Sequence, residues 1–312
     1  MDHVVVENIS KSYNDGKTIA LDQVSFAVKQ GEVFGLIGPD GAGKTSLFRI
    51  LTTLLLPDGG SASVAGMHVV KDYINIRNSI GYMPGRFSLY QDLTVEENLN
   101  FFATLFNTTL RENYELIREI YIQIEPFKNR RAGKLSGGMK QKLALCCALI
   151  HRPIVLFLDE PTTGVDVVSR KEFWDMLGRL KDQGITILVS TPYMEEAILC
   201  DRIALMQSGK ILSIDTPGNI VAQYPKKLYA VKSKNMIRLL RDIRRNDNVE
   251  SCFSFGEFLH VSLRNVNYEN ENRFRELLQE EGHEHVVVKN ISPTIEDCFI
   301  NLMNGMHVST RN

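Results

Sequence analysis

The sequence lacks a long apolar run, an excess of charge of either sign and any low-complexity stretch. Its longest apolar run, Leu143–Ile150, has eight residues. A membrane-spanning helix needs roughly 20, so we expect none. The 36 Lys+Arg and 37 Asp+Glu give a net charge of −1, which leaves no electrostatic case for nucleic acid as the main partner. A hydrophobic content of 44% also excludes global disorder.

Signals for metal binding by cysteine and for secretion are missing as well. The five cysteines are an odd number and have no metal-ligand spacing, which indicates reduced, mostly buried thiols in a cytosolic protein. The N-terminal MDHVVVENIS has neither the basic nor the apolar region of a secretion signal. We therefore expect a cytoplasmic globular chain. Its 312 residues, at ~150 residues per domain, predict about two domains.

The first two thirds of the chain show the pattern of an α/β nucleotide-binding core. The opening segment alternates apolar and polar residues, with a turn at Asn14–Gly16, which predicts antiparallel strands with one solvated face. The run VFGLIG predicts a buried strand, followed by a Gly-rich loop and a helix over about Lys44–Leu55. IVLFLD and ITILVS predict two more buried strands, separated by a helix that contains Trp174.

A helical insertion is predicted ahead of those last strands, because the hydrophobic period changes to 3.6 from about Leu93 to Arg131. One helix face there would carry Leu110, Tyr114, Ile117, Tyr121 and Ile124. The predicted fold class is thus α/β: a P-loop nucleotide-binding core with an antiparallel β subdomain and a helical insertion, plus a small α+β C-terminal domain.

That second domain begins near Asp215–Gly218. Beyond it we predict, in order, strand 228–233, helix 235–246, strands 249–255 and 258–263, helix 270–281 and strand 285–289. A last helix would start with Ser292 as its cap and Pro293 at its first position. The order β-α-β-β-α-β is that of a ferredoxin-like unit. The predicted domains are therefore 1–215, with a helical subdomain at about 86–150, and 216–312.

A complete P-loop pattern stands between the strand VFGLI and the next helix. Its glycines would let backbone N–H groups turn toward the β- and γ-phosphates of a nucleotide, at the positive end of the helix. Lys44 would supply charge to those phosphates, and the Thr45 hydroxyl would be a magnesium ligand. The predicted cofactor-binding residues of this loop are Gly38, Pro39, Asp40, Gly41, Ala42, Gly43, Lys44, Thr45 and Ser46.

Two more segments contain candidate functional residues. Asp159 and Glu160 end the strand IVLFLD, where a carboxylate can contact magnesium and the next one can polarise water. Ser136, Gly137 and Gly138 lead into a helix and form a second possible anion site. Because one P-loop already binds the phosphates, this site is best explained by a nucleotide held in a second subunit, with a simple helix cap as the alternative.

This order of motifs resembles the ATP-binding cassette (ABC) family over about residues 3–215. The tail with Ser-Pro-Thr-Ile-Glu-Asp-Cys-Phe is similar to cassettes of bacterial multidrug-type exporters. The resemblance implies a head-to-tail dimer, homomeric or with a second cassette subunit, in which each ATP lies between one P-loop and the other subunit's Ser136–Gly138 segment. It implies that Tyr13 stacks on adenine, that Asp159 serves Mg²⁺, that Glu160 is the general base and that Asp166 lies in the D-loop. An exposed strand aromatic is the alternative for Tyr13.

Two positions depart from the family pattern. The family would have glutamine where Gly85 stands, contacting magnesium and the attacking water, and histidine where Pro192 stands, touching the γ-phosphate. Neither glycine nor proline can make these contacts. One transition-state contact can be worth ~3 kcal/mol, or about a hundredfold in rate. We therefore expect this chain's own P-loop site to be slow.

Several other features have ordinary explanations. His283-Glu284-His285 is expected to be a solvated turn, His151 a helix cap, and Arg238, Arg241, Arg244 and Arg245 the solvated face of a helix. A set of five aromatic residues and one leucine is expected to be mostly core, with one or two members exposed where the resemblance places a cleft for a membrane subunit. That set is Phe87, Leu89, Tyr90, Phe101, Phe102 and Phe106.

The expected function is the ATP-binding, ATP-hydrolysing subunit of an export transporter. Its cofactors would be ATP and Mg²⁺, and its partners transmembrane permease subunits that bring it to the inner face of the cell membrane. A nucleotide-gated module with little hydrolysis is the alternative that Gly85 and Pro192 favour. A soluble cassette acting on ribosomes or DNA is less consistent, because the sequence has no second cassette, long coiled-coil insert or zinc cysteines.

Overall fold

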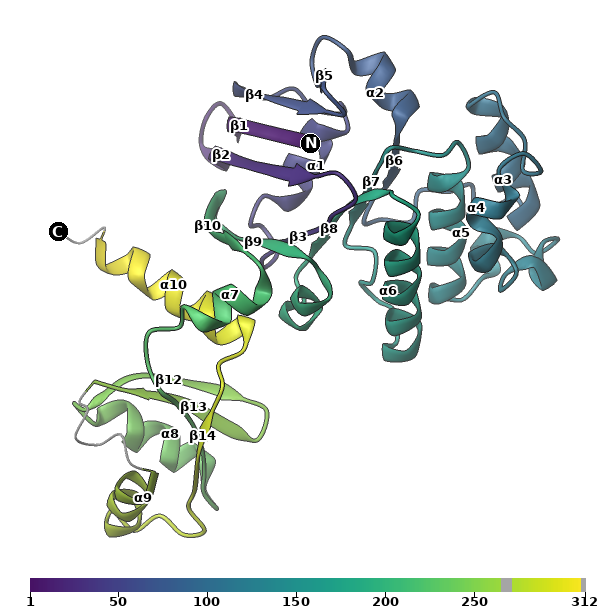
Figure 1. The fold of residues 1–312 in the computed structure, drawn as a ribbon. Coiled ribbons are helices and arrows are strands. Elements are labelled where there is room, and N and C mark those ends of the chain that lie inside the picture. Colours follow the sequence, from purple (N-terminus) through teal and green to yellow (C-terminus); the bar gives the residue numbers. More distant parts are fainter. Residues whose placement is uncertain (265–270, 310–312) are drawn as a thin grey trace. The chain divides into compact units, whose positions relative to one another are not determined.

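The computed structural model describes residues 1–264 and 271–309, with residues 305–309 in backbone only. Two compact units emerge, one containing Met1–Pro217 and the other Gly218–Asn304 (Figure 1). Each unit has its own hydrophobic core. Asn270, where one helix was predicted to start, and residues 310–312 of the predicted second domain lie outside the described residues.

An antiparallel sheet forms from the first strands of the chain, in the order β2-β1-β4-β5. Its strands are β1 (Asp2–Tyr13), β2 (Thr18–Lys29), β4 (Gly59–Val64) and β5 (Met67–His68). Val4 and Val6 of β1 are buried and alternate with more exposed neighbours, and Ile9 is buried after an irregularity in the pairing with β2, so the prediction of a one-sided strand is confirmed. Asn14, Asp15 and Gly16 have positive φ angles and form the predicted turn.

A six-stranded sheet carries the core of the first unit, in the order β10-β9-β3-β8-β7-β6 (Figure 1). All neighbours except β10 and β9 run parallel. Its strands are β3 (Val33–Ile37), β6 (Ile80–Met83), β7 (Val155–Asp159), β8 (Thr186–Thr191), β9 (Arg202–Gln207) and β10 (Lys210–Asp215). Every residue of β3, β7 and β8 is buried. Because parallel strands end at the same edge, the loops after β3, β7 and β8 meet there.

The helices of this unit differ in two places from the prediction. They are α1 (Lys44–Leu51), α2 (Tyr73–Ser79), α3 (Val95–Leu105), α4 (Tyr114–Tyr121), α5 (Gly137–Leu149) and α6 (Val167–Asp182), with 3₁₀ turns η1 (Glu125–Phe127), η2 (Ala132–Lys134) and η3 (Met194–Leu199). α1 stops short of Leu55, because Thr53 has a φ of 64° that no α-helix allows. α4 covers only Tyr114–Tyr121, so Leu110 and Ile124 of the predicted helix face lie outside it.

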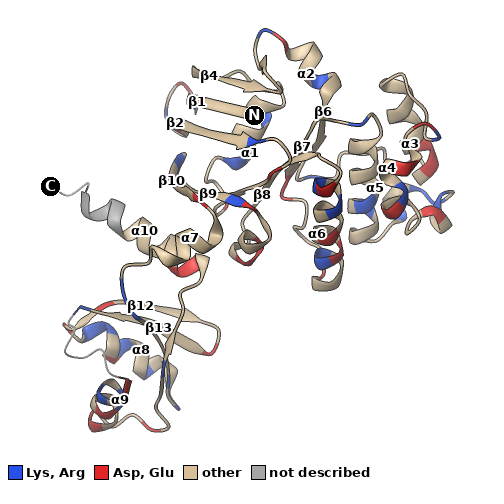
Figure 2. Ribbon diagram, in the orientation of Figure 1, with Lys and Arg blue, Asp and Glu red and all other residues tan. Residues whose placement is uncertain are grey.

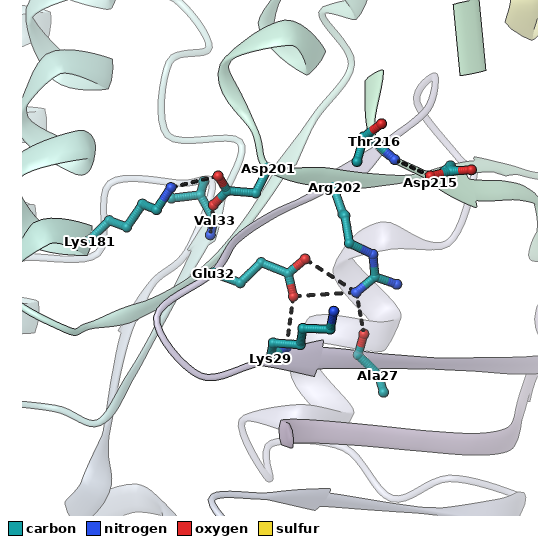
Figure 3. A network of polar contacts seen from close by, with 9 residues as sticks. All are labelled: Ala27, Lys29, Glu32, Val33, Lys181, Asp201, Arg202, Asp215 and Thr216. Carbon is teal, nitrogen blue, oxygen red and sulfur yellow. Dashed lines mark hydrogen bonds and ion pairs between the residues drawn. The ribbon is translucent and has the colours of Figure 1, made fainter. Parts of the chain in front are cut away.

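A polar network joins the amino-terminal ends of β3 and β9, at the opposite edge of the sheet (Figure 3). Glu32 is only 6% exposed, and Arg202 Nη1 lies 3.2 and 3.4 Å from its two carboxylate oxygens. Asp201 accepts from the backbone N–H of Val33 at 2.9 Å and from Lys181 Nζ at 2.6 Å. These contacts attach the last turn of α6 to the start of β3 and β9.

The second unit contains a four-stranded antiparallel sheet in the order β12-β13-β11-β14. The elements that lie wholly or mostly in it are α7 (Pro217–Ala222), β11 (Leu228–Lys232), α8 (Met236–Arg245), β12 (Val249–Phe255), β13 (Phe258–Leu263), α9 (Glu271–Glu280), β14 (Val287–Ile291) and α10 (Ile295–Ser309). The sequence places β12 and β13 with the bounds that the structure shows.

Two predictions in this unit were wrong in detail. The strand expected from His285 begins at Val287, because His285 has a φ of 53°, outside the β region. The cap of the last helix is Thr294 rather than Ser292. Thr294 Oγ1 accepts from the N–H of Asp297, and the Thr294 N–H donates to Asp297 Oδ2, which is a capping box with aspartate in place of glutamate.

All five cysteines are free thiols and buried, as predicted. Burial raises the pKa of Cys252 and Cys298 to about 11 and raises those of Cys146, Cys147 and Cys200 further. Within the described ranges, no helix is both long and apolar enough to cross a membrane.

Candidate functional site

The loop between β3 and α1 has a shape that only glycine permits at several positions. Gly41 and Gly43 have φ angles of 77° and 106°, in the left-handed region. A Cβ on Gly43 would lie 2.3 Å from the carbonyl oxygen of Ala20, and one on Gly38 would lie 2.1 Å from that of Met206. Gly43 is the N-cap residue of α1 and brings no side-chain cap. The first N–H groups of this helix therefore remain for an anion.

Lys44 points back across this loop. Its side chain is 3% exposed, and Nζ donates to the carbonyl oxygens of Gly38 at 2.7 Å and Pro39 at 3.0 Å. Nζ also lies 3.3 Å from Glu160 Oε1. The structure thus brings the P-loop lysine and the predicted general base into one site.

Ser190, in the neighbouring strand β8, contacts both acidic residues at the end of β7. Ser190 Oγ donates to Asp159 Oδ1 at 2.6 Å and accepts from the N–H of Glu160 at 3.0 Å. Glu160 itself has a φ of 50°, a strained backbone for this residue type. Desolvation, with the negative charge of Asp159, raises the pKa of nearby Tyr82 to about 12.

Oxygen ligands at this edge suit a hard cation. Asp159 is 3% exposed, and the Ser190 donor on one oxygen leaves the second oxygen for a metal. Thr45 stands on the first turn of α1 and offers a hydroxyl. Within the described part of the chain, no group of three or more His, Cys, Asp or Glu could hold a metal ion by itself. A cation here would have to share ligands with phosphate oxygens, as Mg²⁺ does.

Tyr13, at the end of β1, is half-buried rather than fully exposed. Its hydroxyl lies 3.0 Å from Ser46 Oγ, so the aromatic ring is attached to the start of α1. Stacking of this ring on adenine stays a prediction.

The Ser136–Gly138 segment lies against the start of α6. Ser136 caps α5, accepting from the N–H of Met139 at 3.4 Å. A Cβ on Gly138 would lie 2.8 Å from Ser169 Oγ, and one on Gly137 would lie 3.5 Å from the carbonyl oxygen of Gly164. The capping role weighed in the sequence is therefore present, and it does not exclude contact with a second subunit.

Asp166 is the N-cap of α6. Its carboxylate accepts from the N–H groups of Val168 at 3.1 Å and Ser169 at 3.0 Å. These bonds lower the pKa of Asp166, with the Ser169 bond as the largest cause. Asp166 and the Ser136–Gly138 segment thus both contact Ser169, while Lys44, Asp159 and Glu160 meet at the sheet edge.

Gly85 and Pro192 both flank this sheet edge. A Cβ on Gly85 would lie 3.1 Å from the carbonyl oxygen of Asp159 and 3.7 Å from Glu160 Cβ. Pro192 follows Thr191, whose carbonyl oxygen accepts from the N–H of Gly38 at 3.2 Å. A side chain at position 85 would thus lie beside Asp159 and Glu160, and neither Gly85 nor Pro192 provides a polar group here.

Two residues that shape the site were missed by the sequence argument. Ser190 could have been found, because it ends the strand ITILVS next to the strand that ends in Asp159. Glu196 is 1% exposed and accepts from the hydroxyls of Thr162 and Thr191. Nothing in its sequence surroundings marks it as buried.

An apolar groove of about 290 Å³ lies between β6 and the helical insertion. Phe87, Leu89, Phe102 and Phe106 line it, while Tyr90 and Phe101 are exposed. The expectation that this set is mostly core was wrong. Only Leu89 is buried, because Phe87, Phe102 and Phe106 are half-buried walls of the groove. His151 lies in the same groove, where it stacks on Phe106 and contacts the carbonyl oxygen of Ile80 at 2.9 Å, so it does not cap the helix that precedes it.

The basic residues of α8 (Figure 2) are exposed, as predicted for Arg238, Arg241, Arg244 and Arg245, and two of them also contact neighbouring backbone. Arg238 Nη2 donates to the carbonyl oxygen of Glu281 at 2.8 Å, and Arg244 Nη2 to that of Cys252 at 3.4 Å. His283 is buried 3.5 Å from Asp242 instead of lying in a solvated turn. These residues connect α8 to the end of α9 and to β12.

Comparison with known proteins gives consistent matches. The family model described as ABC transporter matches residues 21–163. The chain is 35% identical to the probable multidrug ABC transporter ATP-binding protein YbhF of Escherichia coli (strain K12) over 98% of its own length, but it spans only 53% of that relative. It is 38% identical to the Nod factor export ATP-binding protein I of Rhizobium sp. (strain N33), covering 69% of this chain and 71% of that one.

A solved structure shares the fold of the first unit. It is the dimeric, post-hydrolysis state of the ATP-binding cassette MJ0796 bound to ADP and Pi, with a TM-score of 0.62 and 26% identity. The match covers 68% of this chain and 98% of that cassette.

Proposed function

The chain belongs to the ATP-binding cassette (ABC) transporter family, and from that premise we propose that it is the ATP-binding subunit of an export transporter. It binds MgATP, hydrolyses it and drives separate membrane-spanning subunits from the cytoplasmic side of the membrane. The export names of its relatives, multidrug and Nod factor, support the direction of transport.

The observation that carries this proposal is the proximity of the Lys44 side chain to the carboxylates at the end of β7. Lys44 Nζ lies 3.3 Å from Glu160 Oε1, and Ser190 orients Asp159 beside them. With ATP bound, Lys44 would contact the β- and γ-phosphates, while Glu160 would take a proton from the water that attacks the γ-phosphorus. Mg²⁺, held by Thr45 and Asp159, would neutralise charge on the phosphates.

We propose a head-to-tail dimer, with a second copy or with another cassette subunit. The Ser136–Gly138 segment and Asp166 lie at the starts of α5 and α6, where N–H groups of the α5 start can meet the γ-phosphate of an ATP bound to the partner's P-loop. Tyr13 would stack on adenine in the chain's own site. The dimeric MJ0796 cassette supports this arrangement.

The apolar groove supports docking of the permease subunits. A groove walled by Phe87, Phe102 and Phe106 would take an apolar segment of a membrane protein, because exposed apolar surface of this kind marks interaction sites. The division into an ATP-binding domain, 1–215, and an accessory domain, 216–312, is part of the proposal. The accessory domain would contribute dimer contacts or regulation.

The rate of phosphate release tests this function against its alternative. The proposal expects slow turnover by the purified chain, lost in Glu160→Gln, and faster turnover once the chain is reconstituted with its membrane subunits. A nucleotide-gated module, the alternative that Gly85 and Pro192 favour, would bind MgATP with equal affinity but would show no acceleration in the complex.

A further inference from the structure

Glu196 places a buried carboxylate behind the catalytic edge of the sheet. It lies in η3, which begins three residues after the end of β8, and only 1% of its surface is exposed. Thr162 Oγ1 donates to its Oε1 at 2.7 Å, and Thr191 Oγ1 donates to its Oε2 at 2.5 Å. Arg170 Nε lies 3.6 Å from Oε1. A buried carboxylate is tolerated only when its oxygens are satisfied in this way.

The two threonines belong to different functional segments. Thr162 follows Glu160 by two residues and begins the loop that ends at Asp166. Thr191 precedes Pro192, and its carbonyl oxygen accepts from the N–H of Gly38 at the start of the P-loop. Glu196 therefore connects the loop that follows the general base to the strand end that contacts the P-loop.

This connection is more important here because the glutamine and histidine of the family pattern are replaced by Gly85 and Pro192. Gly85 and Pro192 stand at the site without polar groups, and Glu160 has a φ of 50° that its surroundings must maintain. Ser190 accepts from the N–H of Glu160, and the Thr162–Glu196–Thr191 bridge holds the loop that follows Glu160. The orientation of Glu160 thus depends on backbone position, which these hydroxyl contacts fix.

We propose that Glu196 is a positioning residue for ATP hydrolysis, which acts through Thr162 and Thr191 to keep Glu160 and the 162–166 loop in register with the P-loop. The inference rests on the proposed hydrolytic function. It requires that loss of the bridge lowers the turnover number and leaves nucleotide affinity unchanged, because no member of the bridge is a P-loop residue.

The test uses the full chain and measures phosphate release alongside MgADP binding. Glu196→Ala and Thr162→Val should each lower kcat about tenfold, with KM and the Kd for MgADP within about twofold. The double variant should lose no more than either single variant, since both remove the same bridge. Glu196→Gln, which keeps one acceptor oxygen and the side-chain volume, should recover most of the loss. Glu195→Gln, next to it on the surface, is the matched control and should match the parent.

Thermal unfolding shows whether each variant is folded, and Thr162→Val keeps the test decisive if Glu196→Ala does not fold. Folded variants with parental kcat, or losses in kcat that multiply in the double variant, would overturn the inference alone. A parent chain that releases no phosphate, alone or in its complex, would overturn the proposed function and this inference with it.

Discussion

At the residue scale, the P-loop makes the firmest prediction. Lys44 lies at the phosphate-binding loop, and its side chain is almost fully buried, with 3% exposed. Lys44→Ala should weaken MgATP binding by roughly tenfold or more, because a charge-assisted contact is worth ~1.5–3 kcal/mol. Isothermal titration measures this, with the surface variant Lys210→Ala as the control. Unchanged affinity in Lys44→Ala would place the phosphates elsewhere.

A second residue-scale prediction concerns the unequal use of two nucleotide sites. In a complex with an intact second cassette, Gly138→Asp should abolish most turnover by placing a carboxylate against the partner-bound phosphates. Glu160→Gln should cost much less, because it acts in the site that Gly85 and Pro192 already slow. Steady-state phosphate release by the reconstituted complex compares the two variants.

The packing around Gly138 dictates the control for that comparison. Any Cβ there approaches Ser169 Oγ to 2.8 Å, so Gly138→Ala is needed to measure the steric effect alone. Gly138→Ala should retain far more activity than Gly138→Asp. If Glu160→Gln proves as damaging as Gly138→Asp, then Gly85 and Pro192 are tolerated and this P-loop is a fully working site.

The sequence could predict the site wherever the chemistry is local. Gly38–Thr45 and Asp159-Glu160 are contiguous motifs beside apolar runs, and the structure brings Lys44 and Glu160 together. It could not predict Glu196, because the two threonines that satisfy it come from other segments of the chain. Nor could it assign Phe87 and Phe106 to groove walls, since apolar patterning does not distinguish a core from a lined cleft.

At the scale of elements, the buried strands could be predicted from the sequence, whereas the helix ends could not. VFGLI, VLFLD and TILVST are short apolar runs with no rival interpretation in an α/β chain. The end of α1 and the start of α10 each depend on a single residue, Thr53 and Thr294. The local conformation of these residues competes with the periodic apolar pattern. Boundaries of this kind are set by one backbone angle or one hydroxyl.

An element-scale prediction follows from the network at the start of β3 and β9. Arg202→Leu should lower the free energy of unfolding by about 3 kcal/mol, because it leaves the buried Glu32 carboxylate without its cation. Lys210→Met, which removes an exposed pair with Asp22, should change it by no more than about 0.5 kcal/mol. Urea unfolding of both variants decides this. Equal small losses would mean that Glu32 is adequately solvated.

At the scale of the whole molecule, we expect the two units to have separate functions. A chain truncated after Thr216 should keep MgATP affinity within about twofold, because Lys44, Asp159 and Glu160 all lie in the first unit. Self-association or coupling to the membrane subunits should change. Titration and sedimentation of the truncated chain measure the two effects. Loss of binding in a truncated chain that still unfolds cooperatively would contradict this division.

The buried thiols can report when each unit of the molecule opens to solvent. Only a thiolate attacks a disulfide reagent, and with a pKa of about 11 Cys252 and Cys298 would be about one part in a thousand ionised at pH 8. Cys146, Cys147 and Cys200 lie in the first unit and Cys252 and Cys298 in the second. Labelling at pH 8 followed by peptide mass spectrometry would therefore time the opening of each unit separately. Rapid labelling of all five thiols in the native chain would show that the cores exchange with solvent far faster than their packing implies.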